Sequence, residues 1–149
     1  MGRFRAAVAE GHLAHVWRPG QKHAPDVHGW CRAEDHPTVQ RLQQQLSEYM
    51  AGQRTAFTLP LRVSGSAFAQ AVYSTLAQVP YGQVISYGQL ATAAGYPKAA
   101  RAVGRAMAHN PLLLIIPCHR VVSGNGSLGG YAAGAELKRL ILSIEQTQR

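Results

Sequence analysis

The chain has 149 residues, 46% of them hydrophobic, which is enough for one domain or two small packed subdomains with a buried core. No stretch approaches the ~18 apolar residues of a membrane-spanning helix, and the first residues lack the apolar region of a secretory signal. We therefore expect a cytoplasmic protein that does not enter a membrane.

The formal charge of +8 is spread unevenly along the chain. Residues 1–60 carry seven basic and five acidic side chains (+2), whereas residues 61–149 carry eight basic and two acidic ones (+6). The basic second part favours a polyanionic partner such as nucleic acid. The alternative is a basic surface that has no such partner.

The first third of the chain is typical of a small α/β unit. Residues 3–8 and 12–17 flank Glu10-Gly11 and predict a strand–turn–strand. The loop predicted for residues 18–36 contains three histidines and a cysteine, a set that could bind zinc: His23, His28, Cys31 and His36. Their spacing matches no standard zinc pattern, so a solvated polar loop is favoured and we expect no metal. We also expect no disulfide between Cys31 and Cys118 in an intracellular chain.

A helix and a strand are predicted next. From Pro37 onward apolar residues recur at helical spacing, and Gly52 suits a cap at the end of the helix. Its expected buried face consists of Val39, Leu42, Leu46, Tyr49 and Met50. Residues 57–63 have the apolar character of a strand, which Pro60 would confine to a sheet edge.

Residues 64–66 are interpreted as a linker, with Ser66 as N-cap of a second helix. Farther on, Ser86 and Gln89 fit a capping box that opens a short helix over residues 87–94. Residues 95–97 form a turn, and another helix is expected over residues 98–109. Two short helices joined by a glycine turn predict a helix-turn-helix, although any helical bundle contains similar pairs.

The second of these helices is rich in small residues, with Arg101 and Arg105 four positions apart. Such a composition permits close packing against another helix. It also suits a smooth basic helix that enters a nucleic-acid groove, which the basic half of the chain favours.

Five large aliphatic residues, 112–116, lead directly into Pro117-Cys118-His119-Arg120. Each such side chain gains roughly 1.5–3 kcal/mol on burial, so this run belongs in a core. Cys118 then lies where a buried segment is interrupted by proline. A buried structural cysteine is the simplest interpretation, but the neighbouring His119 and Arg120 make Cys118 a candidate nucleophile.

The C-terminal segment contains a glycine-rich loop and a last helix. Residues 123–131 lack the spacing of a phosphate-binding loop and are interpreted as the flexible wall of a pocket. In the following helix, the residues at the spacing of a buried face are Leu137, Leu140, Ile141 and Ile144. Glu145 stands at the end of that helix, where the helix dipole disfavours a carboxylate. A functional partner such as a histidine would explain it.

The run from Pro117 to Val121, together with Asn110-Pro111, Tyr87 and Arg101, resembles the O6-alkylguanine-DNA alkyltransferase family over residues 68–145. The resemblance implies an α/β (α+β) fold. A small RNase H-like sheet-plus-helix domain (1–63) would precede a mostly helical, winged-helix-like domain with a helix-turn-helix (64–149).

The resemblance also implies direct-reversal DNA repair. Cys118 would accept an alkyl group from guanine O6, and also from thymine O4, once per molecule. His119 would act as base through a bound water, and Glu145 would orient His119. Tyr87 would donate a hydrogen bond towards guanine N3, and Asn110 would hold the bend before the reactive segment. Arg120 is interpreted as structural.

The implied partner is double-stranded DNA containing O6-alkylguanine, bound by a monomer without cofactor. The target base must leave the stack to be reached, and Arg101 would fill its place while the helix lies in the minor groove. The expected DNA-contacting residues are Ala100, Arg101, Ala102, Gly104, Arg105 and Tyr87. The expected base pocket consists of Val121, Tyr131 and Ala132.

Two departures and two alternatives remain. Arg5 and Ala14 stand roughly where some relatives have zinc ligands, and Ala132 replaces a hydroxyl residue of some relatives. One alternative is a non-catalytic module that binds alkylated DNA, although Cys118 argues against it. The other is a cysteine hydrolase, although no glycine-rich elbow or separate histidine is visible.

Overall fold

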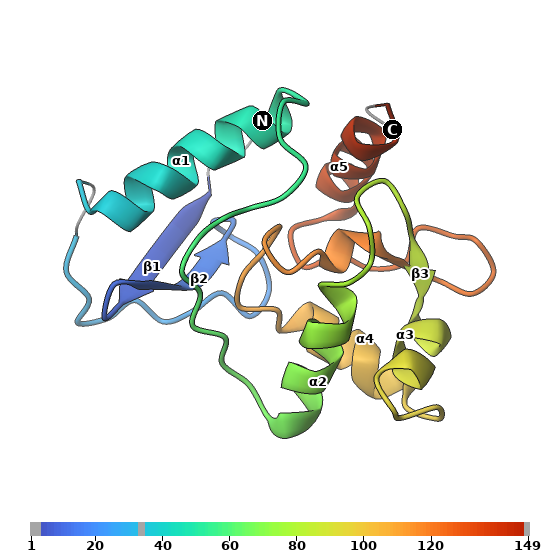
Figure 1. Ribbon diagram of the computed structural model, residues 1–149. Helices are drawn as coiled ribbons and strands as arrows, with labels where there is room; N and C mark the ends of the chain where they lie inside the picture. The colour runs from blue at the N-terminus through green and yellow to red at the C-terminus, as the bar shows by residue number, and fades with distance from the viewer. Residues whose placement is uncertain (1–3, 33–34, 148–149) are drawn as a thin grey trace.

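The computed structural model describes residues 4–32 and 35–147. A small antiparallel sheet is formed by β1 (Arg5–Ala9) and β2 (His12–Trp17), and α1 (Pro37–Met50) packs over it. The turn uses Glu10 and Gly11, both at positive φ (52° and 81°). The predicted strand–turn–strand is therefore confirmed. Figure 1 shows this sheet and α1 on one side of the molecule and the α2–α4 group on the other.

The predicted helix α1 is confirmed, and Gly52 follows it at φ 77°. Its predicted apolar face is largely confirmed, because Leu42 and Tyr49 are buried and Leu46 and Met50 pack against the core. The polar residues Thr38 and Gln45 are buried as well, which the pattern did not predict. Gln45 is buried because its side-chain amide bonds both the N–H and the C=O of Thr58, each at 2.9 Å.

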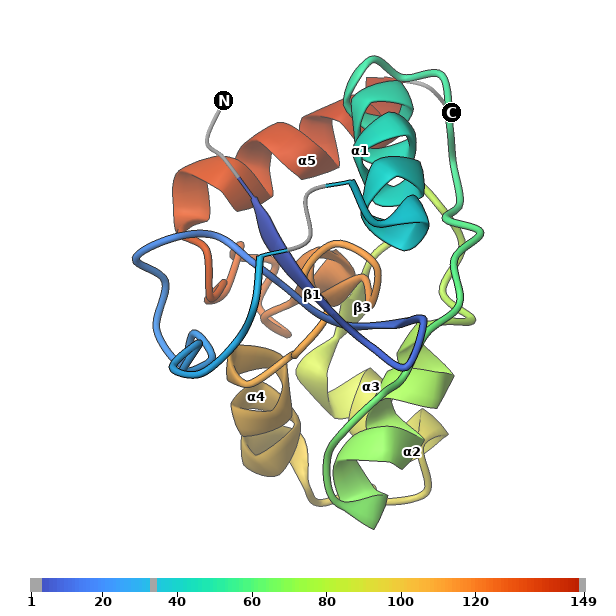
Figure 2. The ribbon, with the colours of Figure 1, turned by 90° about the vertical axis from the view of Figure 1, so that its left-hand side faces the viewer.

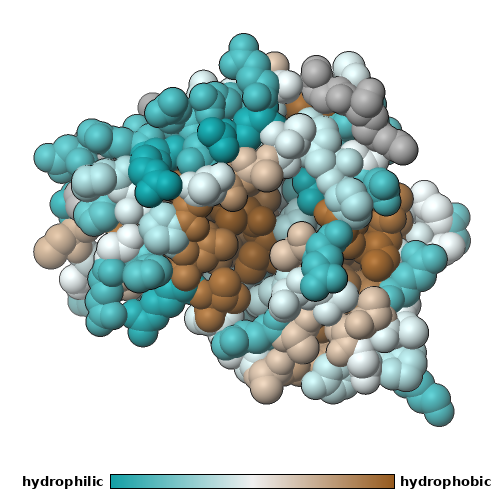
Figure 3. All heavy atoms as spheres, viewed as in Figure 1, coloured by the Kyte–Doolittle hydropathy of each residue, from teal (hydrophilic) through white to brown (hydrophobic). Residues whose placement is uncertain are grey.

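The strand predicted for residues 57–63 is wrong. This segment makes a single bridge, in which Leu13 bonds Pro60 O (2.7 Å) and accepts from Arg62 N (2.9 Å). Pro60 has no N–H to extend the pairing, and the side chain of Gln45 takes up both polar groups of Thr58. Leu61 of this segment is exposed. Figure 3 shows an apolar patch near the middle of this face of the molecule.

The second part of the chain is mostly helical. It contains α2 (Ala67–Leu76), β3 (Ile85–Ser86), α3 (Tyr87–Ala93), α4 (Ala100–Ala108), the 3-10 turn η1 (Cys118–Arg120), β4 (Val121–Val122) and α5 (Ala135–Thr147). The predicted N-cap Ser66 and the capping box of Ser86 and Gln89 are both present. None of the described helices is long and apolar enough to cross a membrane.

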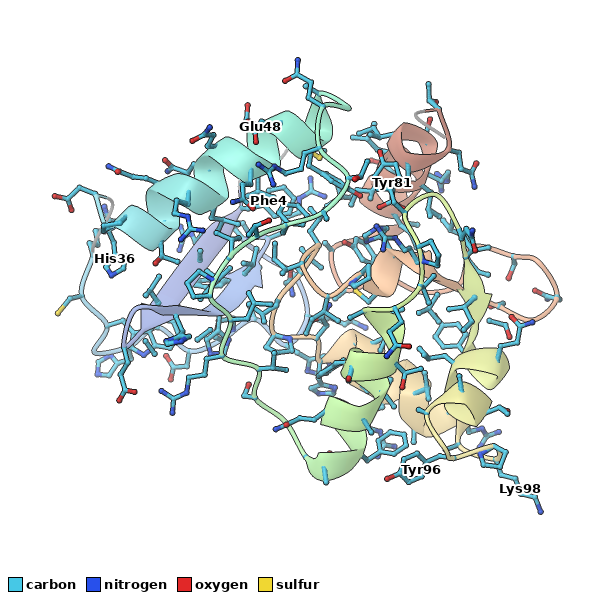
Figure 4. All side chains as sticks on the ribbon, in the orientation of Figure 1. Phe4, His36, Glu48, Tyr81, Tyr96 and Lys98 are labelled. Carbon is cyan, nitrogen blue, oxygen red and sulfur yellow. The ribbon has the colours of Figure 1, made fainter. Side chains whose placement is uncertain are left out.

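The helix-turn-helix is formed by α3 and α4, which pack on each other and on α2. Helix α4 begins two residues later than expected, because a turn closes first through the bond from Ala99 N to Tyr96 O (3.0 Å). Tyr96 and Lys98 project from this turn (Figure 4). Strand β3 pairs in parallel with β4, so the start of α3 is fixed beside the residues that follow η1.

The aliphatic run 112–116 is buried, apart from the partly exposed Ile115. Strand β2 supports it, because Val16 N bonds Pro111 O (2.8 Å) and Leu113 N bonds Val16 O (3.0 Å). Leu114 has φ 73°, a left-handed conformation that is strained for a side chain other than glycine. Figure 2 shows the central position of the sheet, with α1 and α5 at one end of the molecule and α2 and α4 at the other.

The expected core face of α5 needs a correction. Leu140 is 40% exposed, whereas the buried residues are Leu137, Lys138, Ile141, Leu142 and Glu145. The helix is rotated so that two charged side chains, Lys138 and Glu145, point inward with the aliphatic ones. Their burial requires partners, which lie around η1.

Candidate active site and DNA-binding surface

Cys118 is the first residue of η1 and is only 3% exposed. Its backbone is held by the bond from Cys118 N to Ile116 O (2.7 Å). The side-chain amide of Asn110 donates to Cys118 Sγ (3.1 Å) and to Ile116 O (2.9 Å), and its Oδ1 accepts from Leu112 N (2.9 Å). One side chain thus ties both ends of the aliphatic run to the thiol.

Burial raises the pKa of the Cys118 thiol to about 11, although the Asn110 amide and the charge of Lys138 act in the opposite direction. The thiol is therefore protonated at neutral pH. Because the thiolate is the nucleophilic form of cysteine, chemistry at this sulfur needs a base that removes the proton during the reaction.

His119, the next residue in the chain, forms a buried hydrogen-bonded pair with Glu145. His119 Nε2 lies 2.7 Å from Glu145 Oε2, and both residues are fully buried. Burial alone would raise the pKa of Glu145, but hydrogen bonds from His119 and Arg120 outweigh it and hold this pKa well below its usual range. The carboxylate is ionised, so Nε2 carries the proton that it donates.

The other nitrogen of His119, Nδ1, is buried and has no hydrogen-bond partner among the described residues. Burial lowers the pKa of His119 against the opposing pull of Glu145, so the ring is neutral at pH 7. A neutral ring with a proton on Nε2 has a free lone pair on Nδ1. That nitrogen is able to accept a proton.

Arg120 joins this network as a structural residue. Its guanidinium donates from Nε to Glu145 Oε1 (2.9 Å) and from Nη2 to Oε2 (3.0 Å), and Nη1 donates to Val79 O (2.9 Å). These bonds compensate the charge of Glu145, and the conflict between this carboxylate and the helix dipole is resolved.

Two buried residues of this site were missed by sequence reasoning. The hydroxyl of Tyr49 donates to Glu145 Oε2, although the sequence placed Tyr49 only in the core. Lys138 Nζ donates to Val121 O (2.6 Å) and Gly130 O (3.0 Å), and burial lowers its pKa to about 8. The spacing of positions 138, 141, 142 and 145 on one helix face was a signal that could have found Lys138.

A cavity of about 160 Å³ lies beside Cys118. Tyr87, Tyr131 and Ala132 line it, as do Gly104, Met107, Ala108 and Gly130. Val121 was expected there too, but it does not line the cavity: it is fully buried and pairs with Ile85. Lys22 and His23 also line the cavity, so the loop that was interpreted as merely solvated contributes to the site.

Tyr87 begins α3 and reaches the cavity over the glycine-rich loop. A Cβ on Gly129 would lie 3.0 Å from the Tyr87 hydroxyl, and Gly129 has φ 74°. Both the contact and the backbone conformation therefore require glycine at this position. The loop is shaped to the Tyr87 side chain.

Helix α4 presents a smooth basic face to solvent. Ala100, Arg101, Ala102 and Arg105 are exposed, while Gly104 is partly buried beside the Tyr87 ring. The opposite face buries Val103, Ala106 and Met107. Close packing therefore accounts for one face only. The small residues beside Arg101 leave room for a partner to approach the helix backbone.

The histidines of the 18–36 loop have other contacts. His36 caps α1 by accepting from Thr38 N (3.1 Å), and the His23 ring stacks on His109 with centroids 3.8 Å apart. Cys31 is exposed, and both cysteines are free thiols. Among residues 4–32 and 35–147, no group of three or more His, Cys, Asp or Glu side chains could hold a metal ion.

Comparison with known proteins agrees with this geometry. The family model described as the DNA-binding domain of 6-O-methylguanine DNA methyltransferase matches residues 67–147. The constitutive methylated-DNA–protein-cysteine methyltransferase of Bacillus subtilis is 45% identical over 114 residues, which span 76% of this chain and 69% of the relative. The methylated-DNA–protein-cysteine methyltransferase of Mycolicibacterium paratuberculosis is 40% identical over 98% of this chain and 87% of its own length.

Among solved structures, Mycobacterium tuberculosis OGT in complex with DNA superposes with a TM-score of 0.90 and 36% identity, covering 97% of this chain and 87% of that one. The matched family region contains Cys118, His119 and Glu145 as well as the exposed face of α4. The chain therefore belongs to the 6-O-methylguanine DNA methyltransferase family, the methylated-DNA–protein-cysteine methyltransferases, which repair DNA by alkyl transfer.

Proposed function

We propose that this protein transfers an alkyl group from O6 of guanine in duplex DNA, and also from O4 of thymine, to Sγ of Cys118. The observation that carries the proposal is a buried thiol at the wall of a cavity, beside a neutral histidine and next to an exposed basic helix. On this proposal α4 binds the DNA and η1 carries the chemistry.

The reaction needs one proton transfer and one displacement. His119 Nδ1 takes the Cys118 proton through a bound water, which suits a buried nitrogen with a free lone pair. The sulfur forms a bond to the alkyl carbon while the bond from that carbon to O6 breaks, and the electron pair returns to the base. The proton held by His119 then passes to the leaving guanine.

Several neighbours stabilise charge during this step. The Asn110 amide and the Lys138 ammonium favour the thiolate as it forms. Tyr87 lines the cavity and would donate to guanine N3 as the base departs. The product is a thioether, which offers water no good leaving group, so each molecule reacts once.

The base has to leave the helical stack because the thiol is 97% buried inside the protein. Arg101 is exposed on α4 and would occupy the vacated position in the stack. Ala100 and Ala102 beside it would allow the helix to lie closely in the minor groove, with Arg105 towards the phosphates. Tyr131 and Ala132 would form the walls around the flipped guanine.

A duplex oligonucleotide with one O6-methylguanine tests the proposal. Incubation should add one methyl group to the peptide that contains Cys118, with a yield of one per protein, and Cys118→Ala should add none. Tight binding to the alkylated duplex without any adduct would instead identify a non-catalytic DNA-binding protein. Repeated turnover would identify a different reaction class.

A further inference from the structure

We infer that Tyr49, on the N-terminal helix α1, is a positioning residue of the alkyl-transfer reaction, whose hydroxyl holds the Glu145 carboxylate in the orientation that accepts the hydrogen bond from His119 Nε2. This inference rests on the proposed function. It extends the reactive network from the matched region 67–147 into the N-terminal part of the chain.

Tyr49 contacts both His119 and Glu145, the two residues of the proposed general base. Its hydroxyl donates to Glu145 Oε2, the same oxygen that lies 2.7 Å from His119 Nε2, and it lies 3.4 Å from that nitrogen. Tyr49 is 1% exposed and Glu145 is fully buried, so water does not compete for this bond. A hydrogen bond to a buried carboxylate is among the stronger ones in proteins.

The ring of Tyr49 is itself held in place. It packs against Phe57 with centroids 5.2 Å apart and meets Tyr81 edge-on at 6.1 Å. Tyr81 lies beside α5 in Figure 4. A rigid aromatic ring from α1 therefore presents its hydroxyl to the end of α5 in a single direction.

The hydrogen bond from Tyr49 affects the pKa of His119 as well as the orientation of Glu145. A carboxylate that accepts several hydrogen bonds is a weaker partner for each donor. Without the Tyr49 hydroxyl, Glu145 would attract the imidazolium form of His119 more strongly and raise its pKa. Other titratable or charged groups near this pair are Cys118, Arg120, Tyr81, Tyr131 and Lys138, and none of them is removed by a change at Tyr49.

Tyr49→Phe keeps the ring and removes only the hydroxyl. The transfer requires neutral His119, so the single-turnover rate falls as pH drops through the His119 pKa. We expect the midpoint of this fall to move upward by about 0.5–1 pH unit in Tyr49→Phe, since one donor to the carboxylate has been lost. In the acidic limb the rate constant should fall roughly three- to tenfold as a result.

Tyr81→Phe is the matched control. The Tyr81 hydroxyl is buried in the same cluster but has no hydrogen-bond partner in the described part of the chain. Its removal should leave the midpoint unchanged. The measurement is single-turnover methyl transfer from the O6-methylguanine duplex, followed between pH 5 and pH 9. The rate constant reports on the reaction, while the final amount of methylated protein reports how much of each variant is folded.

The outcomes separate the two proposals. No adduct in the wild-type protein overturns the proposed function itself. A normal adduct with the same midpoint in wild type, Tyr49→Phe and Tyr81→Phe limits Tyr49 to packing and overturns this inference. The wild-type protein offers a test that does not depend on folding of the variant: NMR should detect a protected tyrosine hydroxyl proton close to the His119 ring, and its absence would also overturn the inference.

Discussion

The two sides of Cys118 differ in burial and in the kind of contact they make. On one side, His119, Arg120 and Glu145 form a closed polar network with no more than 8% exposure at any residue. On the other side, α4 exposes Arg101 and Arg105 to solvent without a hydrogen bond from either guanidinium to a described residue. In the proposed function, the buried side orients atoms for chemistry and the open side contacts the DNA.

This difference predicts two classes of variant. Changes in the buried network should alter stability together with the reaction on any substrate. Changes on α4 should leave stability and the reaction with free base unaltered and weaken only the reaction with duplex DNA. A buried-network variant that slows only the reaction with duplex DNA, or an α4 variant that lowers stability, would contradict this division.

Glu145→Gln should have the largest effect. It leaves the guanidinium of Arg120, which makes two bonds to this carboxylate, buried without a compensating charge. Removing one partner of a buried pair costs about 3–5 kcal/mol. Chemical denaturation measures the loss, and methyl transfer to Cys118 should slow on duplex and free O6-methylguanine alike. A stability within 1 kcal/mol of wild type would show that the network is not a structural unit.

Acid should break the same network. The pKa of Glu145 is depressed in the folded protein by His119 and Arg120, so its stabilising contribution is complete above the unfolded value of about 4.3 and is lost as pH falls below it. We expect the unfolding free energy to decrease with pH below that value. The same titration of Glu145→Gln should have a smaller slope, and equal slopes would assign the acid sensitivity to other carboxylates.

Asn110→Ala removes three hydrogen bonds that join Leu112, Ile116 and the Cys118 sulfur. Leu112 N would lose its Asn110 partner, whereas Ile116 O keeps its bond from Cys118 N, so a loss of about 1–3 kcal/mol is expected. Transfer should slow on both substrates because the amide no longer favours the thiolate. Asn110→Asp serves as a comparison, since it retains the acceptor for Leu112 N but not the donor to sulfur.

Gly129→Ala tests the contact between the glycine-rich loop and Tyr87 at the cavity. The new Cβ would meet the Tyr87 hydroxyl at 3.0 Å, and φ 74° is unfavourable for alanine by about 1–2 kcal/mol. We expect a modest loss of stability and a slower reaction on both substrates because Tyr87 is displaced. Gly124→Ala, where nothing lies within 4 Å of a new Cβ, is the control and should behave as wild type.

Arg101→Ala should have the smallest effect on stability, within about 0.5 kcal/mol of wild type, because the residue is exposed. Repair of duplex DNA should nevertheless weaken while the reaction with free alkylguanine stays near normal. Arg105→Ala should reduce duplex affinity more uniformly and lower the salt slope by about one. Equal losses on duplex and free base in Arg101→Ala would contradict its role as the residue that replaces the flipped base.

Sequence reasoning succeeded where local signals dominate. The helix α1, the N-cap Ser66, the capping box of Ser86 and Gln89 and the buried run before Cys118 all follow from spacing and capping chemistry over a few residues. The conflict of Glu145 with the helix dipole also pointed correctly to a histidine partner. The strand over residues 57–63 failed because a side chain far away in sequence, Gln45, takes the bonds that a neighbouring strand would have made.

The sequence determined the class of chemistry through its resemblance to the alkyltransferase family, since residue type and local order alone left Cys118 open between a structural and a nucleophilic role. Only the tertiary structure decided how the thiol is controlled. Asn110, Lys138 and Tyr49 reach Cys118 and Glu145 from different elements, and Lys22 and His23 reach the cavity from the N-terminal loop. The physical reason is that pKa values and cavities depend on burial and on contacts between distant segments, which no local pattern records.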